Sequence, residues 1–340
     1  MRVSVVNTDS YFDKDRLFKQ SAGLDNALLP FKRLKEVLTI KGIEIHTSDI
    51  LSPDQADVVI FIEVPDFSFG RKKVKPSNLP NQKCILWLFE CKALRPNNYD
   101  RMHHDGYQVI FTWDDDLIKY DPKKYKKLVF SQSFEDRVVP NSWEREGFLT
   151  CVSANKKLAI QGELYSERLK VIKFYEREYP ENFALFGSGW EQFRVNSDTV
   201  YRPLNGLLRR LPKVRSLRPS YRGFVQNKIG ILKKFRFNLC FENFSGQNGY
   251  ITEKIFDSFA AGSIPIYWGP QNITDYIPEA TFIDYRKFGG VGECHQYLEN
   301  LSNDRLAEYQ EEIGLFLRSE KADFFSVDRF AQDMASVLCD

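Results

Sequence analysis

Short, nearly continuous apolar runs alternate with amphipathic stretches through the first part of the chain. Residues 58–64 (VVIFIEV) and 84–89 (CILWLF) are apolar at almost every position, which is typical of parallel strands covered on both faces. Residues 28–41 carry apolar positions at helical spacing and stop before Gly42, as a helix does. Further strands are predicted at residues 2–7, 43–47 and 107–113. The alternation predicts a parallel α/β sheet.

A polar stretch rich in Tyr, Lys and Pro follows, and a second series of strands and helices begins near residue 148. Its predicted strands are residues 148–153, 183–186, 237–241, 264–267 and 281–284. Its predicted helices are residues 163–179, a helix closed by 231–235, and residues 251–261, 291–301, 304–317 and 325–338. We therefore predict two Rossmann-like domains, residues 1–147 and 148–340, facing a central cleft. Such folds bind ligands at the carboxyl ends of their strands.

The segment from Phe237 to Gly269 (FNLCFENFSGQNGYITEKIFDSFAAGSIPIYWG) carries the densest chemical signal. An apolar strand is followed at once by Glu242 and Asn243, and a turn-rich loop then leads into a helix that opens near Thr252, a plausible N-cap. Polar groups at a strand end that face a helix N-terminus are well placed to bind an anion.

Two charged residues open this helix. Lys254 lies in the first turn, where a cation opposes the helix dipole unless a phosphate binds beside it. The residues alone leave open an ordinary solvated lysine. Glu253 is either a surface acid or an acceptor for a ribose hydroxyl.

The order FEN–YITEK–IPIYWG–PEATFIDYRKF, within residues 222–288, resembles the donor-binding signature of glycosyltransferase family 10, the α-1,3/1,4-fucosyltransferases. The resemblance implies a GT-B fold and GDP-L-fucose as donor. It also implies inverting transfer to a glycan hydroxyl with no essential metal or other cofactor. Within the motif it assigns Asn243, Tyr250, Glu253 and Lys254 to donor binding.

Two further site residues follow from the resemblance outside this motif. Arg168, on the helix after the first strand of the second domain, matches an arginine that meets the pyrophosphate; from the residues alone it is a surface arginine of an amphipathic helix. Glu90, after CILWLF, matches the catalytic base, and Glu63, after VVIFI, has the same placement and is the runner-up. A strand-end carboxylate beside aromatic residues is partly desolvated, which raises its basicity. The CKA sequence after Glu90, where many members have Ser-Pro, puts the acceptor preference in doubt.

Composition and charge narrow the classes of function that the sequence allows. The chain has 340 residues, 43% hydrophobic, 28% charged and 14% aromatic, with a net charge of +2. This is globular composition, and it provides no global field for nucleic acid, for which no recognition module is visible. No apolar run is long enough to span a membrane. The six scattered cysteines indicate reduced thiols in a cytosolic compartment.

Three other charged features of the sequence could be functional but also have ordinary structural explanations. The string Asp114–Asp116 contains a DxD pattern that holds a metal in another glycosyltransferase fold, but after a strand it is better explained as a charged turn. His103 and His104 lack metal-ligand spacing and are assigned to the surface or the acceptor side. We therefore expect no metal site. Residues 202–236 contain no acidic residue. Three interpretations of this basic stretch stay open: a solvated loop, a source of positive potential for a bound diphosphate, or a contact with an anionic membrane surface.

These observations lead to one favoured function and two alternatives. The favoured function is a cytoplasmic, inverting fucosyltransferase that acts on a glycan containing galactose or N-acetylglucosamine, in lipopolysaccharide, O-antigen or another surface glycan. Peripheral contact with the inner membrane stays open. The alternatives are a glycosyltransferase of the same fold with another nucleotide sugar, and a non-catalytic nucleotide- or glycan-binding protein.

Overall fold

The computed structural model describes residues 1–19, 27–65, 74–133, 144–191 and 218–339. Its contacts divide the chain into two compact units. The first comprises Met1–Ser133, Gln247–Tyr250 and Ala322–Asp340. The second comprises Phe134–Gly246 and Ile251–Lys321. The first unit thus gains a short loop segment and the end of the chain, both distant in sequence from its sheet.

The first unit contains a six-stranded sheet in the order β2-β1-β3-β4-β5-β6, and every neighbouring pair is parallel. The strands are β1 (Arg2–Val6), β2 (Glu44–Thr47), β3 (Val58–Ile62), β4 (Lys83–Leu88), β5 (Val109–Thr112) and β6 (Tyr125–Lys127). The central strands β3 and β4 are buried along most of their length. Their continuous apolar sequences are explained by packing on both faces.

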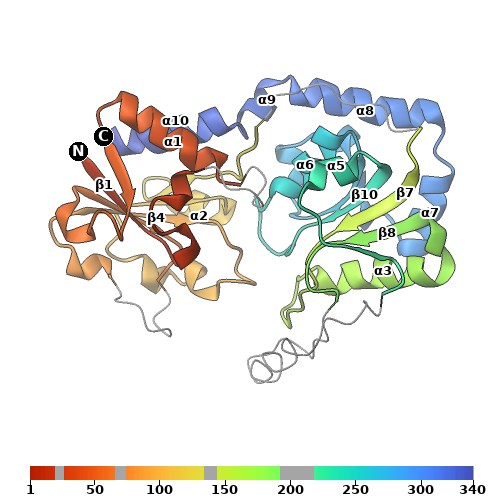
Figure 1. Cartoon of the computed structure of the whole chain (residues 1–340), viewed down its shortest axis with the longest axis horizontal. Helices are drawn as coiled ribbons and strands as arrows, with labels where there is room; N and C mark the ends of the chain where they lie inside the picture. Colours follow the sequence, from red (N-terminus) through yellow and green to blue (C-terminus); the bar gives the residue numbers. More distant parts are fainter. Residues whose placement is uncertain (20–26, 66–73, 134–143, 192–217, 340) are drawn as a thin grey trace. The chain divides into compact units, whose positions relative to one another are not determined.

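Helices cover both faces of this sheet. On one face, α1 (Leu29–Ile40) lies beside α10 (Val327–Cys339), as Figure 1 shows, and Phe31 of α1 packs against Trp87 and Phe330. On the other face, side chains of α2 (Asp115–Tyr120) pack on alternate residues of the same strands, such as Phe61. The carboxyl ends of the strands are left for loops.

The second unit contains another six-stranded parallel sheet, in the order β12-β11-β10-β7-β8-β9. The strands are β7 (Gly147–Val152), β8 (Phe183–Phe186), β9 (Tyr221–Gly223), β10 (Phe235–Phe241), β11 (Ile264–Trp268) and β12 (Ile283–Asp284). The register pairs Phe237 with Ile264 and Phe241 with Trp268. The carboxyl end of β10, a central strand, therefore lies between the carboxyl ends of β11 and β7.

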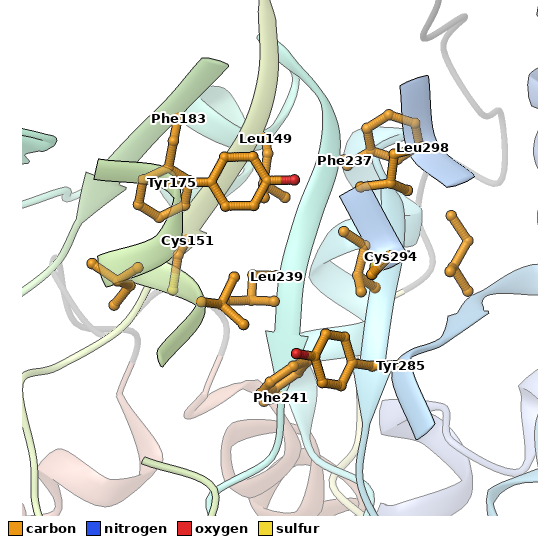
Figure 2. Packing of buried hydrophobic residues seen from close by; sticks show 14 of the residues in the cluster. Leu149, Cys151, Tyr175, Phe183, Phe237, Leu239, Phe241, Tyr285, Cys294 and Leu298 are labelled. Carbon is orange, nitrogen blue, oxygen red and sulfur yellow. The ribbon is translucent and has the colours of Figure 1, made fainter. Parts of the chain in front are cut away.

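One face of this sheet packs on α3 (Tyr165–Glu178) and α7 (Val291–Glu299). Figure 2 shows Tyr175 of α3 and Cys294 of α7 beside side chains from β7, β8 and β10. The other face carries α5 (Lys228–Leu232) and α6 (Glu253–Ala261), which contact β10. The longer helix α8 (Asn303–Leu317) contacts α7 through a hydrogen bond between the hydroxyls of Tyr297 and Tyr309 and contacts α6 through the rings of Phe259 and Phe316. A short helix α9 (Glu320–Asp323) follows it.

Short 3₁₀ helices form many of the connections. They are η1 (Ser10–Phe12), η2 (Arg16–Phe18), η3 (Pro53–Gln55), η4 (Pro76–Asn78), η5 (Pro96–Tyr99), η6 (Arg101–His104), η7 (Pro180–Asn182), η9 (Ile273–Asp275), η10 (Glu279–Thr281) and η11 (Tyr285–Lys287). None of the helices in the described ranges is both long and apolar enough to cross a membrane. All six cysteines are free thiols, five of them buried.

The predicted α/β class with parallel sheets is confirmed. Most predicted strands and helices differ from the observed ones by one or two residues at each end. The elements that had not been predicted include the helix α2 within the polar stretch, the short edge strand β9 and the short helix α9. Asp114 begins α2 because its side chain accepts the amide hydrogens of Asp116 and Leu117.

Candidate functional site

Glu242, the residue after β10, is the centre of a charged cluster in the second unit. Its side chain is fully buried. One carboxylate oxygen accepts the amide hydrogen of Thr252 at 2.9 Å, and the other accepts the Thr252 hydroxyl at 2.7 Å. Tyr267 adds a longer bond of 3.3 Å from the next strand. Glu242 therefore fixes the start of α6 against the carboxyl end of β10.

Lys254, in the first turn of α6, binds the same carboxylate. Its Nζ lies 3.0 Å from Glu242 Oε2 and 2.8 Å from the Thr252 hydroxyl. Burial lowers the pKa of Lys254, but the charges of Glu242 and Glu253 outweigh it and raise the pKa above its usual value. The predicted conflict between this cation and the helix dipole is offset by Glu242. Lys254 is a permanently charged side chain with about a fifth of its surface exposed.

Glu253 lies on the outer side of this cluster. Its carboxylate lies 3.8 Å from Lys228 and 4.0 Å from Lys254, and 45% of its side chain is exposed. Desolvation raises its pKa, but the two lysine charges outweigh this and lower the pKa to about 2. Glu253 is therefore an ionised acceptor open to solvent, a state suited to a hydroxyl ligand.

Arg168, on α3, reaches the same strand end from the other side. It is 4% exposed, and its guanidinium donates to the carbonyl oxygens of Phe241 at 2.7 Å and Glu242 at 3.2 Å. The alternative of a surface arginine is therefore wrong. Arg168 is close enough to Lys254 for its charge to lower the pKa of that lysine. Two cations from different helices thus converge on one strand end.

A cavity of about 260 Å³ opens beside Arg168 at the carboxyl ends of β7 and β8. Its wall comes from the loop after β7, the first residues of α3, and Trp190, which follows β8. Lys156 and Lys157 add two further cations to its lining, and Ser166 adds a hydroxyl. Trp190 is fixed in this wall because its indole donates to Ser153 O at 2.7 Å. The cavity combines a flat apolar wall with several positive groups.

The remaining predicted donor residues lie in different units. Asn243 follows Glu242 in the second unit, is half-buried, and its backbone carbonyl accepts the amide hydrogen of Leu164. Tyr250 belongs to the first unit, where its ring packs 4.7 Å from Trp113 and 6.0 Å from Phe130. The second unit therefore brings together four of the five predicted donor residues, and Tyr250 is held by aromatic neighbours of the first.

Glu90 and Glu63 lie at the carboxyl ends of the adjacent strands β4 and β3 in the first unit. Glu90 is half-buried, and its carboxylate makes no hydrogen bond or ion pair with the described residues. Glu63 is 4% exposed and accepts hydrogen bonds from the backbone amides of Phe89 and Glu90. The two carboxylates, alike in sequence, thus differ in availability.

The other charged motifs have structural explanations. Asp114 caps α2, and nowhere in the described ranges do three or more His, Cys, Asp or Glu side chains gather as a metal site would require. His104 is buried and hydrogen-bonded to Tyr125 and to Asn98 O, so its assignment to the surface or the acceptor side is corrected. Of the basic stretch, residues 202–217 lie outside the described residues, and Lys228 pairs with Asp257 at 2.6 Å.

Three residues of the cluster and the adjoining cavity were not predicted as site residues from the sequence. Glu242 was seen only as part of the FEN motif, although a carboxylate directly after a fully buried strand must find donors nearby. Lys156 and Lys157 lie in a loop without periodicity, so only the fold brings them to Arg168. The one available signal was the position of that loop after a predicted strand.

Comparison with known proteins supports the resemblance found in the motif. Residues 218–312 match the family model for the C-terminal part of glycosyltransferase family 10 (fucosyltransferase). An α-(1,3)-fucosyltransferase of Helicobacter pylori is 37% identical over 83 residues, 24% of this chain and 17% of that protein. A 4-galactosyl-N-acetylglucosaminide 3-α-L-fucosyltransferase of Mus musculus is 32% identical over 118 residues, 34% of this chain and 31% of that protein. The sequence matches thus span less than a third of either relative.

Similarity of structure extends further along the chain. A crystal structure of an α1,3-fucosyltransferase with GDP-fucose aligns with a TM-score of 0.52 and 15% identity, covering 100% of this chain and 90% of that one. At this identity the likeness shows the fold, and it confirms the predicted GT-B class. Glu242, Asn243, Glu253 and Lys254 all lie inside the segment that matches the family model.

Proposed function

We propose that this protein is an inverting fucosyltransferase that moves L-fucose from GDP-fucose to a hydroxyl of an acceptor glycan. The observation that carries the proposal is the convergence of Arg168 and Lys254 on Glu242 at the end of β10. This cluster lies beside a cationic cavity and within or next to the segment that matches the family model. A nucleotide sugar carries its negative charge on the diphosphate, so the site and the donor are complementary.

The two cations have a role in the chemical step as well as in binding. As the bond between the anomeric carbon and the diphosphate oxygen breaks, its electron pair leaves with GDP, and negative charge grows on the departing phosphate. Arg168 is held by the carbonyl oxygens of Phe241 and Glu242, and Lys254 by the Glu242 carboxylate, so neither needs to reorganise to stabilise that charge. Lys156 and Lys157 add positive potential from the cavity wall. We propose that these groups supply the charge stabilisation that a divalent metal supplies elsewhere.

The second part of the proposal concerns proton removal. The acceptor oxygen forms a bond to the anomeric carbon on the face opposite the leaving diphosphate, which inverts the configuration, and its proton passes to a base. We propose Glu90 for this role, because its carboxylate is half-buried and unengaged among the described residues. Glu63 is less suited, because its oxygens already accept hydrogen bonds from the protein.

The acceptor proposal rests on the relatives. The name of the mouse relative specifies a galactosyl-N-acetylglucosaminide, and we propose an acceptor of this type, carrying galactose or N-acetylglucosamine. A place in lipopolysaccharide or O-antigen synthesis, in the cytoplasm and in peripheral contact with a membrane, is part of the same proposal. A glycan array probed with labelled GDP-fucose would test this choice directly.

The central experiment compares nucleotide sugars. Purified protein is titrated with GDP-fucose, GDP-mannose and UDP-galactose in EDTA, and transfer to a galactosyl-N-acetylglucosamine disaccharide is followed. We expect GDP-fucose to bind and react best. Preference for another donor would favour the alternative sugar, and binding without turnover on any acceptor would favour a non-catalytic protein.

A variant pair tests the base. Glu90→Gln keeps the size of the side chain and removes its basicity, so we expect kcat to fall at least ~10²-fold with the affinity for GDP-fucose nearly unchanged. Glu44→Gln, an exposed glutamate at the start of β2, is the matched control and should stay active. Full activity of Glu90→Gln would contradict the assignment.

A further inference from the structure

The backbone of Glu63 adopts a conformation that is energetically unfavourable for a residue with a side chain. It follows β3 with φ +67°, in the left-handed region that glycine occupies freely and other residues rarely adopt. A non-glycine residue persists in such a conformation where the surrounding structure holds it, and such residues gather at functional sites. A carboxylate in this costly conformation therefore calls for a role.

The contacts of the carboxylate indicate that role. Oε1 accepts the amide hydrogens of Phe89 at 3.1 Å and Glu90 at 3.0 Å, and Oε2 accepts a hydrogen bond from the Asn98 side chain. Asn98 is itself fully buried and oriented, because its Oδ1 accepts the amide hydrogen of Val64 at 3.0 Å. The side chain of Glu63 thus bridges the turn after β4 to the 3₁₀ helix η5.

No lysine or arginine in the described ranges pairs with Glu63, so only these neutral donors stabilise its charge. Burial raises its pKa to about 7, with a further contribution from the charge of Glu90, against the hydrogen bonds that lower it. From the neighbouring elements it faces Glu90 after β4 and Tyr99 on η5. His104 on η6 touches only the backbone carbonyl of Asn98.

We propose that Glu63 is the positioning residue for Glu90: by holding the amide groups of Phe89 and Glu90, the two peptide groups on either side of Phe89, it fixes the direction in which the Glu90 side chain leaves the sheet. The inference goes beyond the proposed function and rests on it, since it requires Glu90 to act as the base. Glu63 itself need not touch the substrate. The carbonyl of Glu90 is held in parallel by the Tyr99 hydroxyl at 2.9 Å.

The donor and acceptor pattern requires a carboxylate here. In Glu63→Gln one side-chain atom still accepts the two amide hydrogens, but the new NH₂ group meets the NH₂ group of Asn98. We expect kcat to fall about 10- to 100-fold, the scale for a small misplacement of a reacting group. The KM for GDP-fucose should stay within twofold, because four of the five predicted donor residues lie in the second unit and Glu63 does not contact the fifth, Tyr250.

A double variant provides the rescue. Asn98→Asp presents two acceptor oxygens, so Glu63→Gln/Asn98→Asp restores an acceptor opposite the new NH₂ group and still serves Val64. We expect this double variant to recover most of the lost kcat. The single variant Glu63→Gln should in turn lose the decline in kcat below about pH 7 that protonation of Glu63 produces in the wild type. A general packing role for Glu63 would not move this inflection.

Glu63→Gly separates positioning from backbone strain. Glycine relieves the left-handed conformation, so the variant should fold, but it removes the acceptor for both amide groups and should remain slow. The matched control is Lys14→Gly, an exposed residue with φ +60°, which relieves similar strain without changing kcat. Wild-type kcat in Glu63→Gly would overturn the proposal.

Hydrogen exchange tests the positioning contact without relying on enzymatic activity. Exchange at residues 84–94 should be faster in Glu63→Gln and Glu63→Gly than in the wild type, and should return toward the wild-type rate in the double variant. If the wild type transfers no sugar but this pattern holds, the proposed function fails and the positioning contact stands. If the wild type is active and exchange and kcat are both unchanged in the variants, the positioning role is refuted.

Discussion

The buried carboxylate of Glu63 should make the stability of the first unit depend on pH in a defined direction. Burial raises its pKa from 4.5 to about 7 in the folded state, so folding favours the protonated form. The stabilisation is therefore complete below about pH 4.5 and is lost as the pH rises through 7. At about 1.36 kcal/mol per pH unit, the loss is about 3 kcal/mol once both states are ionised.

The substitution Glu63→Gln removes this titration. The stability of the variant relative to the wild type should therefore become more favourable by about 2–3 kcal/mol between pH 5 and pH 8, whatever the absolute effect of the lost hydrogen bonds. Hydrogen exchange of the β3 and β4 amides, measured for both proteins at each pH, reports this difference, since the chemical exchange rates cancel in the comparison.

Glu44→Gln serves as the control, because its glutamate is exposed. A difference between Glu63→Gln and the wild type that stays constant from pH 5 to pH 8 would refute the reasoning. So would a difference that moves in the opposite direction, since it would mean that folding favours the ionised carboxylate.

Three further outcomes concern the donor cluster. Arg168→Ala and Lys254→Ala should each lower kcat/KM by about 10²- to 10³-fold in steady-state assays, whereas the exposed controls Arg177→Ala and Lys233→Ala should not; similar losses in the controls would point to a general electrostatic effect. Glu242→Gln should destabilise the second unit by up to about 3–5 kcal/mol in urea unfolding, because it leaves a buried cation with a weaker partner, and an unchanged midpoint would count against the role of Glu242. Activity should persist in EDTA, and a loss that only manganese reverses would contradict the metal-free proposal.

Strands in the middle of the two sheets were predictable because burial on both faces leaves a local signal. The runs at 58–64 and 84–89 became β3 and β4 within two residues at each end. The edge strand β9 was missed because its three residues, Tyr221–Gly223, are not fully buried, so no apolar run marks it. Helix α2 was missed because its signal is a capping aspartate within an acidic string rather than a hydrophobic period.

The sequence said less about where elements distant along the chain lie in the fold. The pattern at residues 325–338 predicted an amphipathic helix, but an apolar stripe does not say which sheet it covers, and α10 packs with α1 in the first unit. The same limit applies to Lys156 and Lys157. Their position beside Arg168 depends on the course of a loop, which no periodicity records.

Three glutamates in this chain follow an apolar run directly, in VVIFIE, CILWLFE and FNLCFE, and the sequence treats them alike. The neighbours of each carboxylate separate them. Glu242 is saturated by Thr252 and Lys254, and Glu63 by two backbone amides and Asn98. A carboxylate whose lone pairs are already occupied orders the groups around it, whereas one with free lone pairs is available to take a proton. Since only the Glu90 carboxylate has no partner among the described residues, Glu90 alone of the three is suited to chemistry on this argument. The other two hold in place the base and the cations on which the proposed reaction depends.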